Sequence, residues 1–154
     1  MTGARTVALV GAVGGAGTTR TAVELAAVLA RDGQDVAVLD AAFATQGLAG
    51  YVQGRLDPDL TALVTDAADA PLADGLVDLP LGPAVPGRAA VCPADAPFER
   101  LARAKTAAAA RAFEERLAQA REAFDRVLVD VPPVAANQAV AAATAAERVV
   151  LVAP

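Results

Sequence analysis

Short hydrophobic runs recur along the chain and are separated by longer segments with helical spacing. Five runs of four or five residues, rich in Val, Leu and Ala, cover residues 6–10, 36–39, 89–92, 126–129 and 149–152. Continuous apolar runs of this length are typical of strands that are buried on both faces of a parallel sheet. The pattern therefore predicts five short strands.

Between these runs, apolar residues repeat every three or four positions, as they do on one face of a helix. This spacing predicts helices over residues 18–31, 60–68, 97–124 and 136–147. Two of them carry clear apolar stripes, at Val23, Ala26, Ala27 and Ala30 and at Phe113, Leu117, Ala120 and Phe124. Residues 41–59 are predicted to form a loop with a short helical piece, and residues 71–87, rich in Pro and Gly, to form loops.

Strands that alternate with helices at this rhythm predict an α/β fold. We expect a mainly parallel β-sheet with helices on both faces, which is a Rossmann-like three-layer sandwich. No internal repeat or change of composition divides the chain. Residues 1–154 are therefore predicted to form a single domain.

Composition and charge exclude several classes of protein. Hydrophobic residues make up 55% of the chain and charged residues 20%, which excludes a disordered segment. Thirteen basic against eighteen acidic residues give a net charge of −5, and aromatic residues are only 3%, so no nucleic-acid-binding signature is present. The chain contains no His, which excludes Ser-His-Asp catalysis and His-based metal sites.

The single cysteine and the arginines are predicted to be structural. Cys92 has no second cysteine to pair with, which fits the reducing cytoplasm, and it is expected to be a buried strand residue. The chain also has no secretory signal or membrane-spanning run, so we expect a cytoplasmic protein. Five arginines mix with glutamates over residues 100–122 and are predicted to form a solvated helix face: Arg100, Arg103, Arg111, Arg116 and Arg121.

The candidate chemistry lies where the predicted strands end. Gly11, Gly14, Gly15 and Gly17 follow the first strand and open a helix. Such a loop presents backbone N–H groups and the positive end of a helix dipole, which together suit a phosphate. Asp40 and Asp130 end two other strands, and ligands of parallel sheets bind at these carboxyl ends.

One interpretation of the loop is a dinucleotide site. Gly11, Gly15 and Gly17 fit the G-x-x-x-G-x-G loop of short-chain dehydrogenases, with Asp40 as the carboxylate that binds the ribose. Those reductases also need a Tyr-x-x-x-Lys pair for proton transfer. Tyr51 is followed by an arginine four residues later, and the chain's one lysine, Lys105, has no tyrosine four residues before it. An NAD(P)-dependent reductase is therefore the less favoured alternative.

A second interpretation covers more of the chain. Residues 13–21, VGGAGTTRT, resemble the deviant Walker A loop K-G-G-x-G-K-T-T of the ParA/MinD family of P-loop ATPases. Residues 124–133, FDRVLVDVPP, resemble the family's Walker B strand and switch segment, and residues 147–154, ERVVLVAP, resemble its next strand. The resemblance implies a P-loop NTPase-like fold and ATP-dependent positioning or partitioning of a cargo.

The resemblance also assigns site residues. It implies that ATP or ADP is bound by Gly14, Gly15, Ala16, Gly17, Thr18, Thr19 and Arg20. Thr19 and Asp130 match the family's Mg²⁺-contacting hydroxyl and carboxylate, so we expect the two side chains to lie within a few ångströms of each other. Asp40 matches the first switch aspartate and is the one candidate catalytic residue.

The sequence departs from the family where the chemistry is carried out. Val13 stands for the signature lysine, Thr18 for the phosphate-loop lysine, and Ala42 for the second switch carboxylate. Arg20 is two positions along the helix from Thr18, so its side chain is expected to point about 200° away and not to replace the lysine directly. These departures predict weak nucleotide binding and little or no ATP hydrolysis.

Three functions follow in order of preference. The first is a hydrolysis-deficient regulatory nucleotide-binding protein, and the second is a pseudo-ATPase scaffold that binds only proteins. The reductase is third. By the resemblance, the expected partner is a second copy in a homodimer or another protein. The chain stops at Pro154, directly after a predicted strand, so the C-terminal part of the family fold is expected to be missing.

Overall fold

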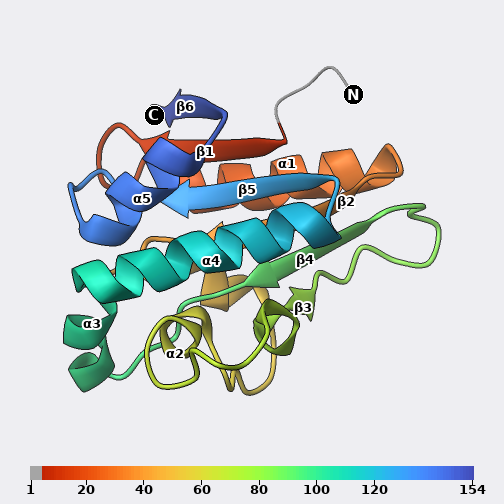
Figure 1. The fold of residues 1–154 in the computed structure, drawn as a ribbon. Helices are drawn as coiled ribbons and strands as arrows, with labels where there is room; N and C mark the ends of the chain where they lie inside the picture. The colour runs from red at the N-terminus through yellow and green to blue at the C-terminus, as the bar shows by residue number, and fades with distance from the viewer. Residues whose placement is uncertain (1–4) are drawn as a thin grey trace.

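The computed structural model describes residues 5–154, and within them the strands form one six-stranded sheet. The strand order is β3-β4-β2-β5-β1-β6, as Figure 1 shows. The strands are β1 (Thr6–Gly11), β2 (Asp35–Asp40), β3 (Val77–Asp78), β4 (Arg88–Cys92), β5 (Arg126–Val131) and β6 (Arg148–Val152). All neighbouring pairs are parallel except β3 with β4. The predicted mainly parallel sheet is confirmed.

The order of the central strands separates two classes of nucleotide-binding fold. In the usual dinucleotide-binding sheet, the first and second strands are direct neighbours. Here β5 lies between them, paired with β1 on one side and with β2 on the other. This order argues against the reductase alternative.

Helices cover both faces of the sheet, and apolar side chains fill the two interfaces. Helix α1 (Thr18–Arg31) packs on one face, while α4 (Ala107–Ala123) and α5 (Asn137–Ala145) pack on the other (Figure 1). Beneath α1 the buried core consists of small and branched residues, among them Leu9, Ala22, Ala26, Ala30, Val36, Val38 and Leu128. The predicted three-layer α/β sandwich is therefore confirmed.

The opposite core is larger and contains the stripe predicted on the third helix. Phe113, Leu117, Ala120 and Phe124 are all buried there. The ring of Phe113 meets the ring of Phe43 edge to face, with 6.3 Å between their centroids. Cys92 is also buried in this core, as predicted, and burial raises the pKa of its thiol far above the usual range. A thiol in this state is not a nucleophile.

The prediction of one helix over residues 97–124 is wrong. The segment forms α3 (Phe98–Ala104) and α4, with a break at Lys105 and Thr106. The side chain of Thr106 accepts a hydrogen bond from the N–H of Ala109, so Thr106 caps a new helix instead of continuing the old one. The apolar stripe alone did not reveal this cap.

Two other element boundaries also differ from the prediction. The helix expected over residues 60–68 is only one turn, α2 (Leu60–Leu63). Residues 41–59 form a loop that contains the short 3₁₀ helix η1 (Gly47–Tyr51), as predicted. Residues 71–87 hold a second 3₁₀ helix, η2 (Leu72–Gly75), and the edge strand β3. A two-residue strand is too short to carry a detectable hydrophobic pattern.

The prediction that Arg116 lies on a solvated helix face is wrong. Its side chain is buried, and its guanidinium donates hydrogen bonds to the carbonyl oxygens of Leu63, at 2.9 Å, and Ala68, at 2.6 Å. Leu63 ends α2, so the guanidinium supplies a donor to a carbonyl group that has no partner within the helix. Arg116 therefore ties the α2 region to α4.

Candidate functional site

The glycine loop connects β1 to α1 at the end of the sheet to which the parallel strands point (Figure 1). Gly15 and Gly17 have φ angles of +77° and +84°, a conformation that side-chain-bearing residues rarely adopt. Gly17 is the N-cap of α1 and supplies no side-chain cap to the first-turn N–H groups. The loop thus leaves donors of the helix N-terminus directed at whatever lies in front of it.

Thr18, in the position where the resemblance places the phosphate-loop lysine, packs its hydroxyl against the end of β1. A Cβ atom added at Gly11 would lie 2.7 Å from the Thr18 Oγ1. The close approach explains why a glycine stands at position 11. It also shows that the hydroxyl of Thr18 is directed toward the end of β1.

Thr19 and Asp130 are in direct contact. The Thr19 Oγ1 donates a hydrogen bond of 2.5 Å to the Asp130 Oδ2, which confirms the predicted proximity of the two side chains. Asp130 lies near the end of β5, and only 1% of it is exposed. Burial raises the pKa of Asp130, whereas the hydrogen bond from Thr19 lowers it. Their role as Mg²⁺ ligands stays a prediction.

Asp40 lies beside Asp130 but outside the pocket that the loop forms. The two residues are in register on the neighbouring strands β2 and β5. The Asp40 carboxylate is fully buried and accepts hydrogen bonds from the N–H groups of Ala42, at 2.9 Å, and Ala94, at 3.2 Å. Burial, followed by repulsion from Asp130, raises the pKa of Asp40 to about 8.

A pocket of about 460 Å³ opens in front of the glycine loop. All seven residues predicted to bind nucleotide line it, together with Asp130: Gly14, Gly15, Ala16, Gly17, Thr18, Thr19 and Arg20. Val13 and Ala42, which stand where the family has charged residues, also line the pocket. At these two positions the pocket therefore has neutral side chains where the family has charged ones.

The sequence did not point to three further lining residues, Thr45, Gly47 and Tyr51. They belong to the segment between β2 and α2, which has no periodic pattern. A Cβ atom at Gly47 would lie 3.1 Å from the Thr19 Oγ1, so this segment packs closely against the first turn of α1. This segment is distant from the glycine loop in the sequence and reaches it only when the chain is folded.

Arg20 is on the rim of the pocket. Its Nε donates a hydrogen bond of 2.9 Å to the Glu24 Oε1, one turn further along α1. Both side chains are mostly exposed, and Tyr51 is near enough to act on the Arg20 guanidinium electrostatically. The guanidinium is therefore held beside the loop rather than inside it.

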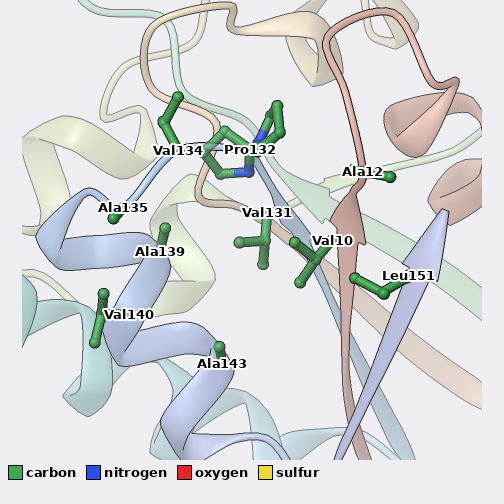
Figure 2. A pocket seen from close by; sticks show the side chains of 12 residues that line it. Val10, Ala12, Val131, Pro132, Val134, Ala135, Ala139, Val140, Ala143 and Leu151 are labelled. Atoms are coloured by element: carbon green, nitrogen blue, oxygen red, sulfur yellow. The ribbon is translucent and has the colours of Figure 1, made fainter. Parts of the chain in front are cut away.

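A second pocket, of about 470 Å³, lies on the other side of Pro132 and Pro133, which line both pockets. Figure 2 shows that aliphatic side chains from β1, β5, α5 and β6 surround it. No charged side chain lines it among the residues that the structure describes. Val140 and Leu151, on its rim, are 54% and 72% exposed.

A glycine loop between a buried strand and a helix, with a carboxylate on the adjacent strand in contact with the first turn of that helix, defines a P-loop NTPase-like fold. A family model described as "AAA domain" matches residues 4–153. The chain belongs to this family, and within it to the ParA/MinD type of P-loop ATPase that the sequence resembles. No curated protein sequence matches the chain.

Solved structures show the same fold. MinD from Pyrococcus horikoshii OT3, complexed with Mg-ADP, matches with a TM-score of 0.78 and 22% identity over 96% of this chain and 57% of its own. Cobyrinic acid a,c-diamide synthase from Mycobacterium smegmatis, with ADP and magnesium, gives 0.76 and 23% over 96% and 59%. Apo McdA from Cyanothece gives 0.74 and 24% over 96% and 57%. The chain thus spans less than three-fifths of the length of these structures.

Within residues 5–154, no helix has the length and apolar character needed to cross a membrane. The same part of the chain contains no group of three or more His, Cys, Asp or Glu side chains arranged to hold a metal ion.

Proposed function

We propose that the glycine-loop pocket binds the phosphates of ADP or ATP together with Mg²⁺. The observation that carries the proposal is the hydrogen bond between Thr19 and Asp130. It joins a hydroxyl in the first turn of α1 to a carboxylate at the end of β5, and both residues line the pocket. The Mg-ADP and ADP–magnesium complexes of MinD and of the cobyrinic acid a,c-diamide synthase support the choice of ligand.

The donor set fits Mg²⁺ when a phosphate is present. Magnesium needs six oxygen ligands in octahedral geometry and keeps several waters. Thr19 and Asp130 supply a hydroxyl and a carboxylate, and a cation beside the buried carboxylate would offset its cost of burial. Phosphate oxygens and water would complete the shell, and the bound ion would neutralise phosphate charge.

Binding is expected to be weak because the loop has no lysine. A hydrogen bond to a charged group contributes roughly 1.5–3 kcal/mol, so its loss weakens triphosphate binding about 10- to 150-fold. Thr18 contributes a short neutral side chain instead. The backbone N–H groups of the loop remain to hold the phosphates.

Hydrolysis is expected to be slow or absent for the same reason. Phosphoryl transfer depends on cations that stabilise charge in the transition state. Val13 and Thr18 supply none, and Ala42 supplies no carboxylate to orient the attacking water. We therefore propose a regulatory role, in which bound nucleotide sets the conformation that a second copy or a partner protein recognises.

Thermal unfolding with ADP, ATP and NADPH, each with and without Mg²⁺, tests this function. A ligand that binds the native state raises its stability by RT ln(1 + [L]/Kd), so millimolar ligand reveals even a weak site. We expect stabilisation by ADP and ATP in the presence of Mg²⁺ and none by NADPH.

A protein-binding scaffold is the second candidate. The apolar pocket beside Pro132 and Pro133 favours it, because such a pocket suits a protein partner better than a phosphate. In that case, no nucleotide would change the unfolding temperature. The two candidates thus give opposite results in the same experiment.

A further inference from the structure

The charges that line the glycine-loop pocket are few. Among the lining residues that the structure describes, Arg20 carries the one basic side chain and Asp130 the one acidic side chain. A nucleoside diphosphate or triphosphate brings several negative charges to this pocket. Mg²⁺ offsets part of that charge, so Arg20 is, among the described lining residues, the one basic side chain that can offset more of it.

The position of Arg20 allows it to reach the pocket. It is in the first turn of α1, immediately after Thr19, and helical side chains lean toward the helix N-terminus. An arginine at this place therefore extends over the turn that opens onto the loop. Arg20 lines the pocket together with Tyr51. The contact with Glu24 raises the pKa of the Arg20 guanidinium, and Tyr51 is near enough to raise it further electrostatically.

Glu24 draws the same guanidinium in the opposite direction. It lies four residues after Arg20, one turn further from the loop, and its Oε1 is 2.9 Å from the Arg20 Nε. The two side chains are 75% and 64% exposed, so water screens the pair and little energy is needed to separate it. Glu24 therefore holds the Arg20 guanidinium only weakly.

We propose that Arg20 is the phosphate-binding side chain of this pocket and that Glu24 competes with the phosphates for it. The inference rests on the proposed function, because it assigns the cation for that same ligand. Binding exchanges the contact between Arg20 and Glu24 for a contact between Arg20 and the ligand. Glu24 thereby lowers the affinity for every ligand that carries phosphate.

The substitutions Arg20→Gln and Glu24→Gln test the two halves of the proposal with opposite signs. Titration calorimetry of the full chain with Mg-ADP should show about fivefold weaker binding for Arg20→Gln and about twofold tighter binding for Glu24→Gln. In the double variant, removal of Glu24 should have no effect, because the side chain that it holds is gone.

Two controls separate a specific contact from a general effect of charge. Arg88→Gln also removes one exposed arginine that is paired with a carboxylate, Asp78, but it lies at the first residue of β4, at the opposite end of the sheet from the pocket. Its affinity for Mg-ADP should equal that of the unsubstituted protein. Adenosine, which has no phosphate, should bind the Arg20→Gln variant as it binds the unsubstituted protein.

Opposite shifts for Arg20→Gln and Glu24→Gln, with Arg88→Gln unchanged, support the proposal. If the unsubstituted protein binds Mg-ADP and neither Arg20→Gln nor Glu24→Gln changes the affinity, the role of Arg20 is wrong while the proposed function stands. If the unsubstituted protein binds neither Mg-ADP nor Mg-pyrophosphate, both are overturned. Unfolding temperatures without ligand show whether the variants, all at exposed positions, are folded.

Discussion

The hydroxyl of Thr19 donates a 2.5 Å hydrogen bond to the carboxylate of Asp130, although 111 positions separate the two residues in the sequence. The contact joins the first turn of α1 to the end of β5. It exists because β5 pairs directly with β1, which leads into the glycine loop. The strand order therefore places a carboxylate beside a phosphate-type loop, and the proposed nucleotide site depends on this placement.

Thr18→Lys should strengthen nucleotide binding, because it returns an ammonium group to a loop that still has its glycines. We expect the Kd for Mg-ADP to fall roughly 10- to 150-fold, as measured by titration calorimetry. Thr18→Met is the matched control, since it adds length without charge and should give no such gain. Equal affinities for the lysine and methionine variants would mean that the loop does not bind phosphate.

ATP turnover should be negligible. Val13, Thr18 and Ala42 replace the charged groups on which phosphoryl transfer depends in relatives with an intact loop. Release of inorganic phosphate from Mg-ATP should stay at the background level of Asp130→Asn. Turnover that is well above background and is abolished by Asp130→Asn would contradict the expected hydrolysis deficiency.

The stability of the ligand-free protein should depend on the proton carried by Asp40. Its pKa is raised from 3.8 to about 8, chiefly by burial. The folded form therefore binds a proton more tightly than the unfolded form does, and this stabilisation is complete below about pH 4 and is lost as the pH rises to about 8. Urea unfolding should show a shallower fall in stability between about pH 5 and pH 8 for Asp40→Asn. Asp69→Asn, at an exposed position, should keep the slope of the unsubstituted protein.

Arg116→Ala should destabilise the fold. The substitution removes the hydrogen bonds to the carbonyl groups of Leu63 and Ala68 and leaves a cavity in the core. We expect the free energy of unfolding to fall by about 3 kcal/mol in urea titrations. Arg111→Ala, on the exposed face of the same helix, should change it by less than about 0.5 kcal/mol. A comparable effect of the two substitutions would contradict the structural role of Arg116.

Patterns that depend on a single element were predictable from the sequence. Apolar runs located β1, β2, β4, β5 and β6. The apolar stripe that begins at Phe113, with successive spacings of four, three and four residues, located the buried face of α4. The glycine loop, Thr19 and Asp130 could be assigned because loop and carboxylate both occur at strand ends. Their proximity was expected from the likeness to the ParA/MinD family, and the hydrogen bond confirms it.

Features that no repeating pattern and no family motif marks were not predictable. Arg116 is buried because the end of α2 and the loop that follows it place the carbonyl groups of Leu63 and Ala68 opposite it, whereas its charge alone predicted exposure. Thr45, Gly47 and Tyr51 reach the pocket through an irregular segment without a periodic signal. The break before α4 depends on one hydrogen bond from the N–H of Ala109 to Thr106, which a helical stripe does not reveal.

Calorimetric titration of the unsubstituted protein with ADP, in Mg²⁺ and in EDTA, tests the central claim most directly. A site in which Thr19 and Asp130 position the magnesium ion, with no lysine to help, should bind ADP in Mg²⁺ and lose most of that affinity in EDTA. Asp130→Asn should show the same weak binding under both conditions, and Asp125→Asn, at the amino end of β5, should behave as the unsubstituted protein. Binding of ADP that is equal in Mg²⁺ and in EDTA, or that is unchanged by Asp130→Asn, would contradict the account.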